Sequence, residues 1–438
     1  MVILIKAVQL LLSLSILVII HEFGHFAFAR LFKTRVEKFY LFFNPWFSLF
    51  KYKKGETEYG IGWIPLGGYV KISGMIDESM DKEQMKQPPQ PWEFRSKKAW
   101  QRLLIMIGGV LMNFVLAALI YIAVLFTWGN DYLPVQNMKY GITADTLAYE
   151  IGFRNGDNII SVNGKTYESF QENLIEILLS KERNIQVERD NNPFTVLISN
   201  RQIGKVLANK DLFIKPRHEF IIDTVVPERG AFQAGIQKGD KLIALNDSSM
   251  IFYDQYQKYF KTHKNSTASI TVERSGSRVT LPVQIDSLGL IGVGYEPFAG
   301  LELKHDDYSL FSSIPAGITK GIKEVKNYLR QFKLIFNPEI KGHEKIGSFI
   351  AIGNMFAPVW DWQSFWTLTA FLSIILGVIN IFPIPALDGG HVMFVLYEII
   401  SGRKPSDKFL EYAQIVGFVI LLALIIFALR NDFINYIW

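Results

Sequence analysis

The sequence predicts an α-helical polytopic membrane protein with four transmembrane helices, a re-entrant β-loop and two inserted α+β domains. Of the 438 residues, 49% are hydrophobic although 20% are charged, which fits a membrane protein with a sizeable soluble portion. Four stretches are apolar and long enough to cross a bilayer. Between the second and third of them, a pattern of glycine, aspartate and asparagine recurs 83 residues later.

The four candidate spans each offer about 20 apolar residues, the length that a bilayer core requires. They cover residues 2–31, 102–128, 364–387 and 411–430. The first is too long for a signal peptide and is expected to be retained. The net charge of +5 is modest and no nucleic-acid-binding motif is present, so we expect no nucleic-acid partner. The absence of cysteine excludes disulfides, thiolate ligands and cysteine catalysis.

The charge of the loops predicts the orientation in the membrane. Twelve lysines and arginines lie between residues 33 and 98, and such loops remain in the cytoplasm. Residues 129–363 are then outside, and the loop at 388–410 is again cytoplasmic. The first span would carry its C-terminal half toward the cytoplasmic side.

That half of the first span contains the motif His21-Glu22-Phe23-Gly24-His25. On a helix, residues i and i+4 share one face, so His21 and His25 can direct their imidazoles to one metal ion. Glu22 lies beside them, where a carboxylate can accept a proton from a water molecule at the metal. Ionisable residues inside a span are costly and therefore indicate function.

The end of the third span supplies a third ligand candidate. Pro383 and Pro385 cannot continue a regular helix, because each lacks an N–H and collides with the preceding turn. Asp388 is then expected at a depth comparable with His25, and zinc would balance its charge. Two histidines, one carboxylate and an open fourth position are typical of catalytic zinc. The alternative is that Asp388 caps a helix beginning at Gly389. Nearby His391 is a weaker ligand candidate, and we expect it to support the ligands or to have a structural role.

Residues 56–74 are apolar, rich in β-forming side chains and interrupted by glycine. Such backbone is tolerated at membrane depth only beside protein or a wet cavity. We expect a re-entrant β-hairpin or loop next to the metal, with a surface hairpin at the membrane face as the alternative. Residues 76–99 are polar and rich in proline and are expected to form a linker.

The repeat predicts two small domains, at residues 129–218 and 219–300. Its first copy contains Gly152, Gly156, Asp157 and Asn163, and its second contains Gly235, Gly239, Asp240 and Asn246. The pattern resembles the PDZ domain in its bacterial, protease-associated form, which implies capture of extended chain ends by strand addition. A β-rich module without a ligand is the alternative. Residues 301–363 are expected to hold a basic amphipathic helix from Ile314 to Phe336.

Three features together resemble the site-2 protease family of intramembrane zinc metalloproteases, in its bacterial sigma-E-regulating branch. They are the motif at His21–His25, the sequence from Asn380 through Pro383 and Pro385 to Asp388-Gly389-Gly390, and the repeat. By that resemblance His21, His25 and Asp388 match the zinc ligands and Glu22 the catalytic base. Other matching positions contact substrate: Asn380, Pro383 and Pro385 in the motif of span three, and Gly67, Gly68, Tyr69 and Val70 in a re-entrant loop that adds substrate as a strand. One residue departs from the family pattern: Val110 follows Gly109 in the second span, where the family usually has a proline.

The resemblance implies regulated proteolysis of single-span, type II membrane proteins already trimmed on the outside, such as anti-sigma factors or remnant signal peptides. It also implies an inner-membrane location, periplasmic PDZ-like domains and an active site toward the cytoplasmic side. Two other classes compete with this hypothesis. One is a membrane metallopeptidase with a downstream glutamate ligand, which the Leu387-Asp388-Gly389-Gly390 sequence disfavours. The other is a non-catalytic scaffold, which would not need Glu22.

Overall fold

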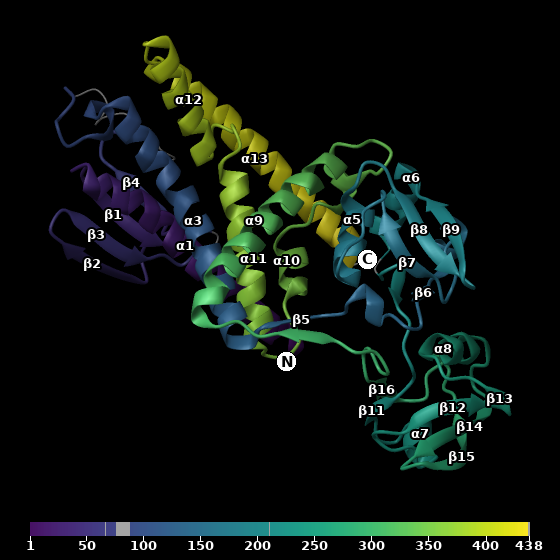
Figure 1. The fold of residues 1–438 in the computed structure, drawn as a ribbon. Helices are drawn as coiled ribbons and strands as arrows, with labels where there is room; N and C mark the ends of the chain where they lie inside the picture. Colours follow the sequence, from purple (N-terminus) through teal and green to yellow (C-terminus); the bar gives the residue numbers. More distant parts are fainter. Residues whose placement is uncertain (66, 76–87, 210, 437–438) are drawn as a thin grey trace. The chain divides into compact units, whose positions relative to one another are not determined.

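The computed structural model describes residues 1–438 except 66, 76–87, 210 and 437–438. It consists of two compact units (Figure 1). The helical unit contains residues 1–129, 307–333 and 343–438. The β-rich unit contains residues 130–306 and 334–342.

Within the described part of the helical unit, four helices are long and apolar enough to cross a membrane: α1 (Val2–Leu31), α3 (Ala99–Trp128), α11 (Trp362–Asn380) and α13 (Asp407–Tyr436). The prediction of four such helices is confirmed. Helix α11 ends at Asn380, seven residues before the end of the expected span, because Pro383 and Pro385 cannot extend it. The expected loop at 388–410 begins with a further helix, α12 (Asp388–Ser401).

Glycines bring α1 and α3 into backbone contact. A Cβ atom on Gly24 would lie 2.2 Å from the carbonyl oxygen of Gly108, and one on Gly108 would lie 2.7 Å from that of Gly24. Neither position accepts a side chain without separation of the helices. Small residues at helix contacts are common in membranes because they permit such close approach. The contact places the histidine-bearing face of α1 directly against α3.

A four-stranded sheet joins α1 to α3. Its strands are β1 (Val36–Leu41), β2 (Phe50–Lys54), β3 (Thr57–Ile61) and β4 (Tyr69–Ile72), in the order β2-β3-β1-β4. Strand β3 runs parallel to β1 and β4 antiparallel to it. The expected β-structure at 56–74 is therefore present, but β3 and β4 flank β1 and do not form a hairpin with each other. Within the expected linker, residues 76–87 lie outside the described part, and η1 (Phe94–Ser96) follows.

The remaining segments of the helical unit pack against the long helices. Helix α9 (Leu310–Ile335) matches the expected amphipathic helix to within four residues; η3 (Gly342–Lys345) and α10 (Phe349–Met355) follow. The buried carboxylate of Asp432, near the end of α13, accepts hydrogen bonds from the backbone N–H groups of Ser348 (3.0 Å) and Ala351 (3.1 Å). This contact holds the first turn of α10 against α13.

The β-rich unit has two lobes, each with its own hydrophobic core. Lobe 1 consists of β6 (Ile142–Ala144), α4 (Thr146–Ile151), β7 (Asn158–Val162), α5 (Phe170–Leu179), β8 (Asn184–Arg189), β9 (Asn192–Leu197), α6 (Asn200–Ala208) and β10 (Ile214–Pro216). Lobe 2 consists of β11 (Ile222–Val225), α7 (Gly230–Gln233), β12 (Lys241–Leu245), β13 (Ser248–Ser249), α8 (Tyr253–Thr262), β14 (Thr267–Arg274), β15 (Ser277–Gln284) and β16 (Val293–Tyr295). Outside the lobes, β5 (Asn130–Tyr132) pairs with β17 (Lys304–Asp306), and η2 (Val135–Asn137) follows β5.

The sequence repeat corresponds to a repeated set of hydrogen bonds. In lobe 1, Asp157 accepts two bonds from Arg189, whose Nη2 also donates to the carbonyl of Gly152. In lobe 2, Asp240 accepts two bonds from Arg274, which likewise donates to Gly235. The two arginines lie outside the motif recognised in the sequence, and they neutralise the buried aspartates.

A buried carboxylate, Glu219, precedes β11. It accepts hydrogen bonds from Lys241 Nζ (2.7 Å) and Tyr140 Oη (2.6 Å). Burial alone would raise the pKa of Glu219, but these two donors stabilise its ionised form and lower the pKa below its ordinary value.

Candidate metal centre and substrate cleft

Three side chains from two helices converge in the helical unit. His21 and His25 lie one turn apart on α1, and Asp388 is the first residue of α12. The Nε2 atoms of the two histidines are 3.3 Å apart, and they lie 3.1 and 3.2 Å from Asp388 Oδ2. Both histidines are buried, so the three ligand candidates expected from the sequence come together.

The hydrogen bonds of the histidines define what these atoms can do. His25 Nδ1 lies 2.8 Å from the carbonyl oxygen of Ile105, to which it must donate. His21 Nδ1 lies 3.0 Å from the side-chain amide of Asn113, whose Oδ1 is buried without a partner in the described structure. Because amide oxygen and nitrogen are assigned by their partners, we orient this amide so that its oxygen accepts the proton of His21 Nδ1. Both Nε2 atoms then present lone pairs.

Three acceptor atoms that face one another without a shared proton require a cation between them. Zinc binds histidine nitrogen and carboxylate oxygen at about 2.0–2.2 Å, so tetrahedral ligand atoms lie roughly 3.3 Å apart. The observed separations of 3.1–3.3 Å match this value. Metal-bound histidines also donate their second ring N–H to an oxygen, as His25 does to Ile105. The residues present therefore fit a zinc ion.

Glycine and proline residues create the space for this cluster. A Cβ atom on Gly109 of α3 would lie 2.4 Å from His25 Nε2 and 2.7 Å from His21 Cε1. On the other side, a Cβ atom on Gly390 would lie 2.4 Å from the Cα atom of Pro385. A side chain at either glycine would displace the ligand set.

Glu22 faces an open cleft of about 430 Å³ beside the cluster. Strand β4 forms the opposite wall, where Val70 faces the Glu22 carboxylate. Gly68 packs closely enough that a Cβ atom there would lie 2.7 Å from Val18 Cγ1. The cleft therefore places a carboxylate, three candidate metal ligands and the edge strand of a sheet around one space.

The structure brings most, but not all, of the expected site residues to this cleft. Its wall includes His21, Glu22, His25, Gly68, Tyr69, Val70, Asp388 and His391. Among the described residues that line it, the expected substrate contacts Gly67, Asn380, Pro383 and Pro385 do not appear. Gln414 of α13 lines the cleft and was not expected. Gly109 and Asn113 of α3 also reach the histidines, and neither carries an obvious chemical signal in the sequence.

Comparison with known proteins agrees with this geometry. The model of peptidase family M50 matches residues 9–424. A "Regulator of sigma E protease" of Haemophilus influenzae is 28% identical over 97% of this chain and 98% of its own length. A "Putative zinc metalloprotease" of Vibrio cholerae is 28% identical with the same coverage, and a second "Regulator of sigma E protease", from Salmonella typhi, is 26% identical over 97% of both chains.

The match extends across both halves of the cluster, from the first apolar helix to α13. It agrees with the family resemblance carried by the sequence motifs, and the two histidines and the aspartate offer the ligands that a zinc peptidase needs. The chain therefore belongs to peptidase family M50, the site-2 protease family, and is a zinc metalloprotease.

Proposed function

We propose that the protein cuts peptide bonds within the membrane-spanning segments of other proteins. The observation that carries this proposal is the position of the metal cluster. His21 and His25 lie in a helix of 30 residues that is long and apolar enough to cross a membrane, so the reacting bond must reach them at membrane depth.

The roles of the chain's own residues follow from their positions. His21, His25 and Asp388 hold the zinc ion, which as a Lewis acid makes water nucleophilic near neutral pH and polarises a carbonyl. Glu22 accepts the proton of the attacking water and returns it to the leaving nitrogen. The carboxylate lines the cleft opposite Val70 of β4, where a substrate carbonyl would lie.

A substrate helix must unwind before it can be cut, because its carbonyls are engaged in i→i−4 hydrogen bonds. Strand β4 pairs with β1 on one side and lines the cleft on the other. We infer that an unwound substrate adds to β4 through the Gly67–Val70 segment, as in other strand-addition complexes. Asn380, Pro383 and Pro385 would contact the substrate once it occupies the cleft; this assignment follows from the family motif.

The substrate class rests on the relatives and on loop charge. Two relatives are named "Regulator of sigma E protease", which favours a single-span anti-sigma-factor-like substrate, or a remnant signal peptide. The basic loop at 32–101 favours a cytoplasmic position for the sheet and an inner-membrane protein with its β-rich unit in the periplasm. Each lobe of that unit would act as a PDZ-like domain that admits only trimmed substrates or guides their new chain ends.

A reporter with one membrane span and a short outer tail tests the proteolysis in membranes. Glu22→Gln should keep zinc and abolish cleavage, whereas Asp388→Asn should lose both. Glu56→Gln changes an exposed glutamate of the same sheet region and serves as the matched control. Cleavage that persists in Glu22→Gln would exclude Glu22 as the base, and wild-type membranes that bind zinc without cutting would favour a scaffold.

Cysteine labelling tests the orientation independently, since the natural chain has no cysteine. Single cysteines at the exposed positions Lys53 and Ser249 should react with a membrane-impermeant reagent from opposite sides. Lys53→Cys should be protected in intact spheroplasts, and Ser249→Cys should be labelled. The reverse pattern would overturn the proposed topology without affecting the catalytic assignment.

A further inference from the structure

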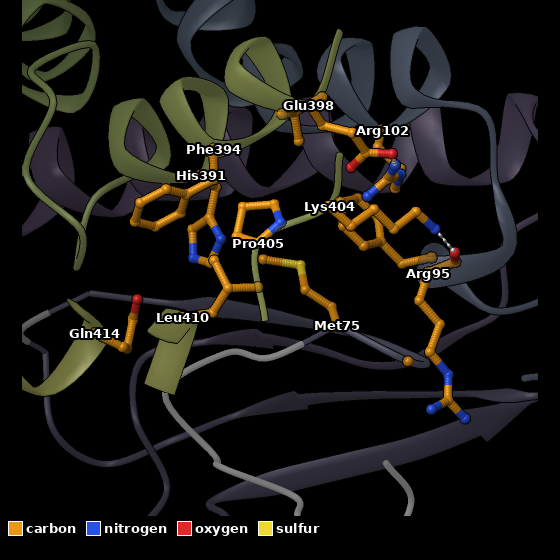
Figure 2. A pocket seen from close by; sticks show the side chains of 13 residues that line it. Met75, Arg95, Arg102, His391, Phe394, Glu398, Lys404, Pro405, Leu410 and Gln414 are labelled. Atoms are coloured by element: carbon orange, nitrogen blue, oxygen red, sulfur yellow. Dashed lines mark hydrogen bonds and ion pairs between the residues drawn. The ribbon is translucent and has the colours of Figure 1, made fainter. Parts of the chain in front are cut away.

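A second cavity adjoins the cleft on the side away from Glu22. It encloses about 110 Å³ between α12, α13 and the segment after β4 (Figure 2). Three residues, Met75, His391 and Gln414, line both this cavity and the cleft. The two spaces are therefore neighbours that share a wall.

The lining of this cavity is mostly apolar, apart from His391 and Gln414, and the charged groups at its rim have hydrogen-bond partners. Phe94, Phe394, Val395 and Leu410 line it together with Met75. At the rim, Arg102 donates to Glu398 at 2.5 Å and Lys404 donates to the carbonyl of Arg95 at 3.3 Å. Figure 2 shows the Arg95 side chain turned away from the apolar residues. The cavity thus offers a hydrophobic surface without a charge that needs a ligand.

Strand β4 leads from the catalytic cluster to this cavity. Val70 faces Glu22 across the cleft, and β4 ends two residues later at Ile72, about 7 Å along an extended strand. The chain then turns, with the Met75 N–H donating to the Ile72 carbonyl. Gly74 and Met75 of that turn line the second cavity. A segment extended along β4 therefore passes from the metal ligands to the mouth of the cavity.

We propose that this cavity is a substrate subsite that binds one aliphatic side chain, two or three residues from the scissile bond. This inference rests on the proposed proteolysis. An apolar cavity of about 150 Å³ holds one benzene molecule; a volume of 110 Å³ suits leucine, isoleucine or methionine and excludes tryptophan. The subsite gives the enzyme a size preference within substrate spans that are otherwise uniformly hydrophobic.

The test is a side-chain scan of the single-span reporter, with full-length enzyme in proteoliposomes and the cut mapped by mass spectrometry. Residues two and three positions from the cut are varied separately through glycine, alanine, leucine and tryptophan. Because side chains alternate along a strand, one of the two positions should respond and the other should not. At the responding position, leucine should be cut about tenfold to a hundredfold faster than glycine, the gain expected from burying its side chain.

Variants of the cavity should change this preference in opposite directions. Leu410→Phe fills the cavity and should favour alanine over leucine, while Met75→Ala enlarges it and should admit tryptophan. Leu424→Phe, an exposed position on the same helix, should behave as wild type. If Leu410→Phe cuts no reporter, Met75→Ala still tests the subsite: cleavage of the tryptophan reporter supports it, and no such cleavage contradicts it.

The outcomes separate this inference from the function on which it rests. Cleavage that depends on Glu22 but shows no size preference, or one that neither cavity variant alters, overturns the subsite and leaves the proteolysis intact. A wild-type enzyme that cuts no member of the scan overturns both.

Discussion

Gly109→Ala should disable the metal centre although it adds only one methyl group, which would lie 2.4 Å from His25 Nε2 and 2.7 Å from His21 Cε1. Unbonded heavy atoms prefer separations of about 3.5–4 Å, so the imidazoles or the helix must move by about 1 Å. Zinc ligands tolerate deviations of only about 0.2 Å. We expect the zinc affinity to fall about tenfold to a hundredfold, which is the range seen when the hydrogen-bond partners of metal ligands are lost.

The assay is a zinc titration of the purified full-length protein against a chromophoric chelator, followed by reporter cleavage. Gly321→Ala is the matched control, because its Cβ atom would lie 3.8 Å from its nearest neighbour, Tyr121 Cδ2, which is an ordinary contact. Alanine is favoured over glycine by about 0.8–1.0 kcal/mol within helices, so a loss at position 109 is not caused by weaker helix formation. Wild-type zinc affinity and cleavage in Gly109→Ala would refute the proposed ligand geometry.

Three further predictions concern side chains that the structure assigns to buried polar networks. Asn113→Leu removes the partner of His21 and should weaken zinc binding about tenfold to a hundredfold in the same titration. Arg274→Met leaves the carboxylate of Asp240 buried without its cation and should destabilise lobe 2 by about 3 kcal/mol, measured by hydrogen exchange. The lowered pKa of Glu219 means that its ionised form stabilises the fold above its ordinary value of 4.5 and loses this effect as the pH falls through the folded-state pKa. Wild type should therefore lose more stability between pH 6 and 3 than Glu219→Gln, as followed by urea unfolding.

The control for Arg274→Met is Arg278→Met, which alters an exposed arginine of the neighbouring strand β15. It should lower the stability of lobe 2 by less than about 0.5 kcal/mol. Equal effects of the two arginine variants would show that Asp240 does not need its partner. An Asn113→Leu protein with wild-type zinc affinity would contradict the reorientation of the amide, and parallel acid sensitivity of wild type and Glu219→Gln would exclude this carboxylate as a source of the pH dependence.

The chemistry of the site was readable from the sequence because its donors are rare residue types in an apolar setting. His21 and His25 are fixed on one helical face by their spacing alone, and Pro383 and Pro385 indicate where α11 must end. Asp388 could be linked to them only through depth in the membrane and the family motif. The structure places all three donors within 3.3 Å of one another.

What the sequence did not reveal depends on contacts between distant backbones. Gly109 has no functional group, and its importance appears only when α3 lies against the histidines of α1. Likewise, the apolar segment at 56–74 indicated β-structure in a hairpin or loop, whereas β3 and β4 pair on either side of β1. The arginines that neutralise Asp157 and Asp240 also lie more than 30 residues further along the chain.

The most direct test of the account is to map the cut made by purified enzyme in zinc-loaded proteoliposomes that contain one single-span reporter. We predict a cut inside the apolar segment of the reporter, present with wild type and absent with Glu22→Gln at equal zinc content. A cut confined to the water-exposed tail, or one that Glu22→Gln makes at the wild-type rate, would contradict an intramembrane zinc protease with Glu22 as its base.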